Sequence, residues 1–475
     1  MNRSGLQFRE VTRKIPLGPQ RKNLAFFHPS FVLAGFVDPW NSRAQSLKHV
    51  NRIATEQTKA GLIRAGIKID STSSGSRPLP ELLILLERRV GAWGRSLEAW
   101  RRLATSVSRT ESAGKTSLRS RVNQWDTAVR GELGGVNQRE LATLAEAALS
   151  SPGSVLARSL LRHQLAHDSS MALQYRTLRV SWEGLRSYFN NPWMAASMIG
   201  RGNLRTRISR AILDGNLESV LDEHLWVTAT LRNLGSDALL DNLTTALALR
   251  TSDVKFYGYD GEQSDYHLRS HAVLPFNESI RRHRPVAVES NEPTVRTEEV
   301  RIAFNSPFWP YVLATTSVGQ EGLDFQTWCS TIAHWDLPGN PVDLEQREGR
   351  VDRYAGLSTR RAIATNNVSY KSDADIACSP WEMLAVQAEH THRDDPVGLA
   401  PWWIVEGTRI KRLVFDIPLS EARARFEDLR KQRLLYRLAL GQPNQADLVK
   451  ALRDRVSPRD AVAATINLSP QYPSN

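Results

Sequence analysis

The sequence contains only two cysteines, Cys329 and Cys378, among its 475 residues. Two cysteines exclude a disulfide framework and a four-cysteine zinc site. No stretch is apolar for long enough to span a bilayer. The first residues lead into polar sequence without the apolar core of a secretory signal. We therefore expect a cytoplasmic protein that has no membrane-spanning segment.

Acidic residues are also comparatively scarce. The 50 Asp and Glu residues face 62 Lys and Arg residues, which gives a formal net charge of +12. An arginine-rich chain favours polyanionic partners, because neutralising phosphates releases their counterions. The alternative is that solvated helix faces simply contain many arginines. Hydrophobic residues make up 41% of the chain, as is ordinary for a globular protein. The composition thus predicts folded domains with DNA or RNA as a partner.

The residues up to about 250 show mostly helical patterns. Helices are predicted over Pro80–Val90, Glu140–Leu149 and Val155–His167, and a polar loop over 106–120. The stretch from about 175 to 250 repeats apolar residues at three- and four-residue spacing, which indicates helices with one buried face.

The pattern changes after residue 252, where short apolar segments appear. Strands are predicted at Val254–Gly258, Tyr311–Thr315, Thr331–Trp335 and Asn366–Tyr370, with a helix over Asp343–Tyr354. Short apolar strands alternating with helices indicate a parallel, doubly wound α/β sheet.

Three regions follow from these patterns. Residues 1–170 are predicted to be mainly helical, and residues 171–370 to be a helical lead-in followed by an α/β lobe. Residues 371–475 are predicted to be a helical extension whose longest helix runs over Ser420–Gly441. The expected fold class is therefore α/β, flanked by helical regions.

The most informative segment runs from Gln346 to Arg353 and reads Gln-Arg-Glu-Gly-Arg-Val-Asp-Arg. Gln346, Gly349, Arg350 and Arg353 stand at offsets 0, 3, 4 and 7, so one continuous helix would place them on one face. Planar guanidinium groups make bidentate contacts with phosphate. Arginine fingers stabilise the charge that develops in phosphoryl transfer. This spacing predicts a phosphate-contacting pair.

A loop ahead of that helix supports the same interpretation. The segment Thr316–Asp324 follows a predicted strand, and ligands of α/β sheets bind beyond the carboxyl ends of strands. The alternative is an exposed charged helix in which Glu345 and Glu348 pair with their local neighbours. The loop and the helix together favour a ligand-binding site.

Together these segments resemble motifs V and VI of a superfamily 2 helicase. Ala303–Phe308, Val312–Phe325 and His334–Arg353 are similar to the C-terminal RecA-like lobe of bacterial helicase-related proteins of the Swi/Snf type. Gly215–His224 resembles the helical segment that leads into such a lobe. The resemblance is strongest over 300–356.

The resemblance implies roles for individual residues. Arg350 and Arg353 would contact the phosphates of ATP, and Gln346 would lie near the γ-phosphate as the third catalytic residue. Gly322 and Asp324 would belong to the nucleotide-binding loop, with the carboxylate approaching the sugar.

Three further residues receive roles from the same resemblance. Gly349 would line the nucleotide site. Thr316 and Ser317 would face the nucleic-acid backbone, since hydroxyl and amide groups commonly position phosphates.

A helicase also needs a G-x-x-x-x-G-K-[ST] phosphate loop and an acidic magnesium-holding motif. The fragment Ala113–Thr116 reads Ala-Gly-Lys-Thr, but Arg109 occupies the place of the first glycine. Asp222–His224 resembles part of a D-E-x-H box, but Leu225 follows where histidine is required and the surrounding pattern is helical. Both are interpreted as chance matches, and no metal ligands are identified.

ATP and Mg²⁺ would therefore be shared with an N-terminal helicase lobe on another polypeptide, and the chain alone would be inactive as an ATPase. The alternative is a non-catalytic nucleic-acid-binding or regulatory protein descended from such a lobe. A pure nucleic-acid binder has no evident need for Arg350, Arg353 and Asp324, so their presence favours the first interpretation.

Other candidates carry less information. His163 and His167 have metal-compatible spacing but no carboxylate-rich partner motif, and His390 and His392 are interpreted in the same way. The pair Trp402–Trp403 would stack a nucleobase or, as we favour, pack the C-terminal helices against the lobe.

Overall fold

The computed structural model describes most of the chain in separate stretches. The described residues are 17–40, 46–70, 75–108, 117–165, 170–198, 200–214, 217–231, 233–248, 252–257, 263–270, 297–315, 324–366, 379–395, 398–416, 419–438, 445–452 and 455–464.

The chain divides into two compact units. The first comprises Met1–Arg250 and Lys371–Met383, and the second comprises Thr251–Tyr370 and Leu384–Asn475. The boundary near residue 170 expected from the sequence falls inside the first unit. Helix α19 (Pro380–Thr391) begins in the first unit and ends in the second.

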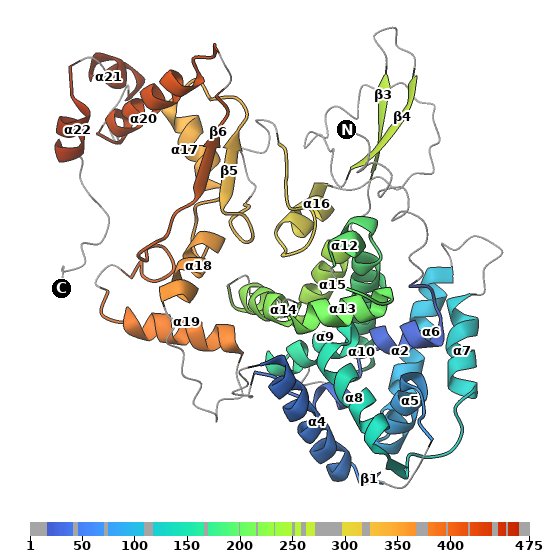
Figure 1. The fold of residues 1–475 in the computed structure, drawn as a ribbon. Coiled ribbons are helices and arrows are strands. Elements are labelled where there is room, and N and C mark those ends of the chain that lie inside the picture. The colour runs from blue at the N-terminus through green and yellow to red at the C-terminus, as the bar shows by residue number, and fades with distance from the viewer. Residues whose placement is uncertain are drawn as a thin grey trace. The chain divides into compact units, whose positions relative to one another are not determined.

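The first unit is built almost wholly from helices (Figure 1). Its α-helices are α2 (Arg21–Phe27), α3 (Phe31–Ala34), α4 (Leu47–Arg64), α5 (Leu79–Arg89), α6 (Trp93–Ser108), α7 (Leu118–Thr127), α8 (Gln138–Ser150), α9 (Pro152–Arg162), α10 (Met171–Arg179), α11 (Arg186–Phe189), α12 (Pro192–Ser197), α13 (Leu204–Leu213), α14 (Leu217–Trp226) and α15 (Ser236–Leu247). Two π-helical segments, η1 (Val180–Leu185) and η2 (Val227–Leu231), interrupt them. Strands β1 (Lys68–Ile69) and β2 (Gly135–Val136) pair in parallel.

Local signals place the helices of this unit close to their predicted positions. Helix α8 begins at a capping box, in which Asn137 Oδ1 accepts from the Glu140 amide and the Glu140 carboxylate accepts from the Asn137 amide. The Ser151 hydroxyl caps α9, which begins at Pro152 rather than Val155 and ends at Arg162. The predicted helices at 80–90 and 140–149 are confirmed as α5 and α8.

A tryptophan-rich core surrounds a buried histidine in this unit. His28 Nε2 lies 2.9 Å from Glu87 Oε1, and the indole of Trp100 donates to His28 Nδ1 at 3.1 Å. Because Nδ1 accepts, the proton resides on Nε2 and points to the carboxylate. Rings of Trp93 and Trp125 contact the imidazole edge-to-face. An aromatic cluster therefore encloses the buried His28–Glu87 hydrogen bond.

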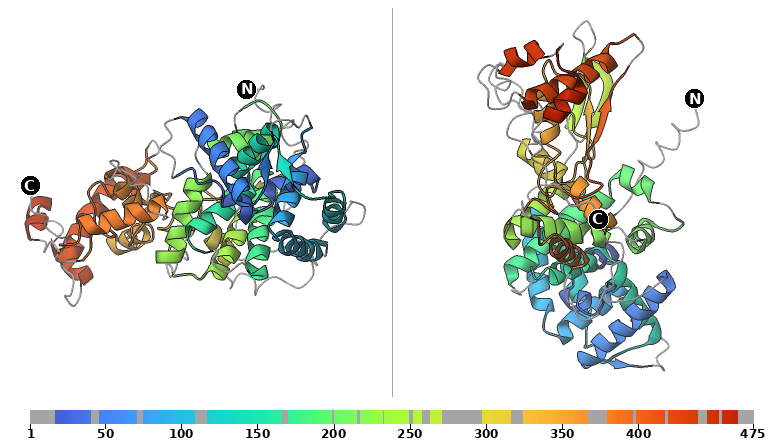
Figure 2. Two further views of the ribbon diagram at one scale, coloured as in Figure 1. Left: turned by 90° about the horizontal axis from the view of Figure 1, so that it is seen from below. Right: turned by 90° about the vertical axis from the view of Figure 1, so that its left-hand side faces the viewer.

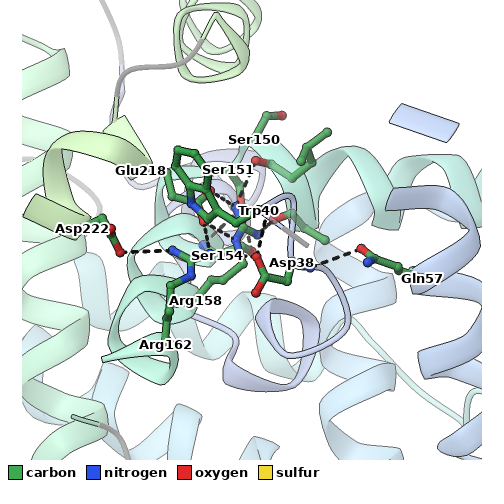
Figure 3. Close-up of polar contacts among 12 residues, drawn as sticks. Asp38, Trp40, Gln57, Ser150, Ser151, Ser154, Arg158, Arg162, Glu218 and Asp222 are labelled. Atoms are coloured by element: carbon green, nitrogen blue, oxygen red, sulfur yellow. Dashed lines mark hydrogen bonds and ion pairs between the residues drawn. The ribbon is translucent and has the colours of Figure 1, made fainter. Parts of the chain in front are cut away.

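A buried ion-pair network joins α9 to α14 (Figure 3). Glu218 accepts from Arg158 Nη2 at 2.6 Å and from Arg162 Nη2 at 2.6 Å, and Arg162 also donates to Asp38 at 3.1 Å. Burial alone would raise the pKa of Glu218, but the two guanidinium groups hold that pKa at about 2. The carboxylate therefore stays ionised in the interior.

The same network holds the start of α19. Asp222 Oδ1 lies 2.9 Å from His163 Nε2, and Asp222 Oδ2 accepts from the amide of Trp381 at 3.3 Å. The rings of Trp226 and Trp381 lie 5.8 Å apart. Asp222 is thus a structural residue on a helix, as the helical pattern around Asp222–His224 predicts.

The second unit combines short strands with helices. Its elements are β3 (Ser252–Tyr257), β4 (Gln263–Ser270), α16 (Thr297–Phe304), β5 (Thr331–His334), α17 (Pro341–Gly349), α18 (Leu357–Asn366), β6 (Lys411–Val414), α20 (Ala422–Leu438), α21 (Gln445–Leu452) and α22 (Pro458–Ala464). Strands β5 and β6 pair in parallel, and α17 and α20 pack against each other (Figure 2).

The strand predictions for this unit are confirmed in part. The strands predicted at 254–258 and 331–335 appear as β3 and β5, but β3 pairs antiparallel with β4. The prediction for Tyr311–Thr315 is wrong, because no described strand pairs with it and the side chains of Tyr311 and Val312 are exposed. Residues 367–370 of the fourth predicted strand lie outside the described residues. The described sheets have two strands each, so they show only a small part of the predicted doubly wound sheet.

The core of the second unit lies next to its parallel strand pair. Phe304, Phe325, Val351 and Ile410 form one buried cluster, against which Ile332 of β5 packs. Because Val351 belongs to the predicted arginine motif, this cluster anchors the motif in the core of the second unit. No helix among those described is both long and apolar enough to cross a lipid bilayer.

Candidate functional site

Helix α17 carries the first half of the arginine motif. Asn340 caps its N-terminus by accepting from the Asp343 amide at 2.9 Å, and Pro341 occupies the first turn. The helix ends at Gly349, and Arg350 is its C-cap. The prediction of one helix to Tyr354 is therefore wrong, because the amides of the next residues fold back onto the Glu348 carbonyl.

The two arginines nevertheless reach the same acceptor. Arg353 Nη1 donates to Asp324 Oδ1, and Arg350 Nη1 lies 3.8 Å from the same oxygen. The Arg350 carbonyl accepts from the Phe325 amide at 2.9 Å, and Arg353 Nε donates to the Gly349 carbonyl at 2.9 Å. A backbone turn, rather than one helical face, brings Arg350 and Arg353 to the same carboxylate.

A hydrogen bond and an aromatic contact hold the segment that carries Asp324. Asn305 Nδ2 donates to the Asp324 carbonyl at 2.7 Å, and the rings of Phe304 and Phe325 pack edge-to-face at 5.5 Å. The carboxylate side chain itself is 47% exposed, and the Arg353 side chain is 39% exposed. An incoming ligand can therefore reach both members of this ion pair.

Gln346 and Gly349 occupy different positions relative to these charges. The Gln346 side chain is exposed on α17 and makes no hydrogen bond with the Asp324–arginine group within the described part of the chain. A Cβ built on Gly349 would meet no atom within 4 Å, so the space beside this residue is open. Open space beside a motif glycine permits a ligand to approach the backbone closely.

Glu348 has a structural role that the sequence does not predict. It is buried, and its Oε2 accepts from Arg433 Nη1 of α20 at 2.9 Å, while Arg412 Nε of β6 lies 2.9 Å from its Oε1. The alternative of an exposed helix with locally paired charges, which the sequence does not favour, therefore does not describe Glu348. Glu345 likewise accepts from Arg437 of α20 at 2.9 Å. These carboxylates attach α17 to the following strand and helix, and thereby position the motif.

His334 lies at the end of β5, beside Glu348. Its Nε2 is 3.9 Å from Glu348 Oε1, and its side chain is buried. Burial lowers the pKa of His334 below its usual value despite the nearby carboxylate. The imidazole is therefore expected to be neutral at pH 7.

Trp402 and Trp403 lie in different environments. Trp402 is buried and donates through Nε1 to Glu389 of α19 at 3.0 Å, as the packing interpretation predicts. Trp403 is half-exposed, and its ring lies 5.7 Å from that of Tyr354. The Ala355 amide donates to the Trp402 carbonyl, so this aromatic segment lies against the end of the arginine motif.

Several residues singled out from the sequence fall in the gaps between the described stretches. Thr316, Ser317 and Gly322 lie outside the described residues, as do Ala113–Thr116 and His167. Among the residues that are described, no group of three or more His, Cys, Asp or Glu side chains is arranged to hold a metal ion.

Comparison with known families places the arginine motif within a larger domain. Residues 273–355 match the model of the helicase conserved C-terminal domain. The match includes Asp324, Gln346, Gly349, Arg350 and Arg353. Searches of curated proteins and of solved structures each gave no significant match. Residues 273–355 are therefore similar to the RecA-like C-terminal domain of superfamily 1 and 2 helicases.

Proposed function

We propose that the second unit acts as the C-terminal lobe of an ATP-dependent nucleic-acid helicase or translocase of the superfamily 2, Swi/Snf-related type. In this proposal Arg350 and Arg353 contact the phosphates of ATP. The observation that carries the proposal is the convergence of both guanidinium groups on Asp324 within the region that matches the helicase domain.

In this proposal a nucleotide phosphate replaces the Asp324 carboxylate as the partner of Arg350 and Arg353. Two guanidinium groups lie beside one carboxylate, so the three side chains together carry a formal charge of +1. A triphosphate offers several anionic oxygens, with which guanidinium groups form bidentate hydrogen bonds. The exposed Asp324 carboxylate would then be released from Arg353 toward the sugar hydroxyls, with Gln346 near the γ-phosphate and Gly322 and Gly349 lining the site.

The proposal requires a second surface that cradles the nucleotide. The sequence shows no complete phosphate loop, so ATP and Mg²⁺ would be held mainly by an N-terminal helicase lobe on another polypeptide. Arginine fingers supplied in trans can provide the transition-state stabilisation that such a lobe lacks. On this basis the chain alone does not hydrolyse ATP, and the complex works in the reducing cytoplasm.

Nucleic acid is the proposed track of the complex. Thr316 and Ser317 would contact the phosphate backbone through hydroxyl and amide donors. The positive net charge of the chain would strengthen this contact at low salt.

The test combines the chain with the product of a neighbouring reading frame that encodes a phosphate loop. ATP hydrolysis is measured for each protein alone and for the mixture, with and without single-stranded and duplex DNA or RNA. Activity that needs both proteins and is lost in Arg353→Ala supports the proposal. A chain that binds nucleic acid but stimulates no such partner would instead be a non-catalytic remnant of a helicase.

Arg430 offers a matched control for this experiment. It lies on α20 in the same unit and, like Arg353, pairs with one carboxylate, that of Glu427 at 3.2 Å. Both side chains of the Arg430–Glu427 pair are more than half exposed. Arg430→Ala therefore removes the same charge without touching the Asp324 group.

A further inference from the structure

A cavity of about 260 Å³ lies in the first unit, apart from the helicase-like domain. Residues of α2, α5, α8 and α13 line it, and α8 packs against both α5 and α13 (Figure 1). Its charged lining residues are Lys22, Glu146 and Arg205. The lining therefore has a net positive charge.

The two cations of the cavity make no ion pair within the described residues. Neither Lys22 nor Arg205 lies within ion-pair distance of a carboxylate in the described stretches, even though Glu146 lines the same cavity. Burial alone lowers the pKa of Arg205, with no opposing contribution from an acidic neighbour. A half-buried guanidinium without a counter-charge is an unusual arrangement, because burying a charge is unfavourable unless it is paired.

Some other half-buried arginines of the first unit have carboxylate partners. Arg77 pairs with Glu140 at 2.8 Å, and Arg88 pairs with Asp126 at 2.8 Å. Arg205 thus differs from the comparably buried Arg77 and Arg88 in lacking an ion-pair partner among the described residues.

The size and donors of the cavity define the ligand. Pockets for whole small molecules usually measure about 300–1,000 Å³, so this cavity suits a phosphate group with part of its sugar. The Ser209 hydroxyl lines the cavity and makes no hydrogen bond with another described residue, so it can donate. Two cations and a free hydroxyl are the groups that commonly bind the phosphates of a nucleic-acid backbone.

We propose that this cavity binds a backbone phosphate of a nucleic-acid strand and gives the first unit its own contact with that strand. The inference rests on the proposed function for its choice of nucleic acid. It adds a binding site that is separate from Thr316, Ser317 and the arginine motif. Such a site would position the strand without reading its sequence.

The test measures binding of the full-length chain to fluorescein-labelled 20-nucleotide single strands of DNA and RNA by fluorescence anisotropy, at several salt concentrations. The double variant Lys22→Ala/Arg205→Ala is compared with Arg52→Ala/Arg102→Ala. The control removes two arginines that are exposed and paired within their own helices. Both variants therefore lose the same net charge.

The expected result is weaker binding of the cavity variant to every sequence. Its plot of log affinity against log salt should be shallower by about 0.7 for each lost phosphate contact, whereas the control should remain close to the unchanged chain. Circular dichroism and thermal unfolding confirm folding of each variant. If the double variant unfolds, Lys22→Ala alone serves, because the Lys22 side chain is exposed.

Three outcomes overturn the inference. Equal affinity and salt dependence for the cavity variant and its control would show that the cavity does not contact the strand. Stabilisation of the unchanged chain by inorganic phosphate or ATP, lost in the cavity variant while oligonucleotide binding is unaffected, would assign the cavity to a small anion. Absence of any oligonucleotide binding would contradict the nucleic-acid part of the proposed function as well. If oligonucleotide binding depends on the cavity but the chain does not stimulate ATP hydrolysis by the partner lobe, only the ATPase proposal is contradicted.

Discussion

The carboxylate of Asp324 accepts a hydrogen bond from the guanidinium of Arg353, 29 positions further along the chain. Arg350 lies 3.8 Å from the same carboxylate oxygen. Both side chains of the Asp324–Arg353 pair are more than one-third exposed, so water screens their attraction. An ion pair of this kind is easily exchanged for a ligand that carries more negative charge.

Replacement of Asp324 by alanine should therefore separate stability from function. We expect the free energy of unfolding to fall by about 1 kcal/mol or less, because exposed ion pairs contribute little. Nucleic-acid stimulation of ATP hydrolysis in the reconstituted complex should be lost. Urea denaturation and ATPase assays measure the two effects. A large loss of stability would mean that Asp324 is mainly structural.

Replacement of Gly349 by alanine tests the open space beside the motif. Alanine should be neutral or stabilise the helix end by up to about 1 kcal/mol, because glycine is a poor helix former. The added methyl group should nevertheless lower activity if the nucleotide approaches this backbone. Gly94→Ala is the control, since Gly94 also lies in a helix, α6, with no atom near its added Cβ. Full activity of Gly349→Ala would argue against close approach.

Glu218 should be the most sensitive carboxylate of the first unit. Its replacement by glutamine leaves Arg158 and Arg162 buried without their shared partner. We expect a loss of about 3–5 kcal/mol in the free energy of unfolding. The exposed Glu56, which pairs with Arg52 at 3.6 Å, provides the comparison, and Glu56→Gln should cost below about 1 kcal/mol. Similar losses for both variants in urea denaturation would contradict the structural role of the network.

The pH dependence of the first unit follows from two carboxylates. Hydrogen bonds from Arg77 lower the pKa of Glu140 from 4.5 to about 2, and Glu218 also has a pKa of about 2. Both pKa values are lower in the folded state, so their stabilisation is complete above about pH 4.5 and is lost as the pH falls toward 2. The melting temperature should decline over this range, and less steeply in Glu140→Gln. An unchanged slope in that variant would refute the assignment.

The sequence allowed prediction of local elements and of motif identity. The serine, asparagine and proline signals around α8 and α9 act within a few residues, so they define helix starts without knowledge of the fold. The motif residues Asp324, Arg350 and Arg353 were likewise identified from spacing and resemblance. The structure places both arginines beside the Asp324 carboxylate, although the helix expected to present them ends at Gly349.

Long-range partners were not predictable in the same way. Glu348 accepts from Arg433, 85 positions away, and β6, which the sequence does not predict, pairs with β5, 80 positions earlier (Thr331 with Lys411). Hydrophobic periodicity indicates which face of a helix or strand is apolar. It does not indicate which distant charged residue will pair with the charged residues of that element. The cavity around Arg205 is not predictable from the sequence for the same reason, because its lining residues come from four separate helices.

The most direct test of the account is the rate of ATP hydrolysis by the chain together with a phosphate-loop-containing lobe, in the presence of nucleic acid. We expect no hydrolysis by the chain alone, activity in the complex, and a fall of at least about 10³-fold in Arg353→Ala. Arg430→Ala should retain full activity. ATP hydrolysis by the isolated chain, or a complex whose activity is unaffected by Arg353→Ala, would contradict the account.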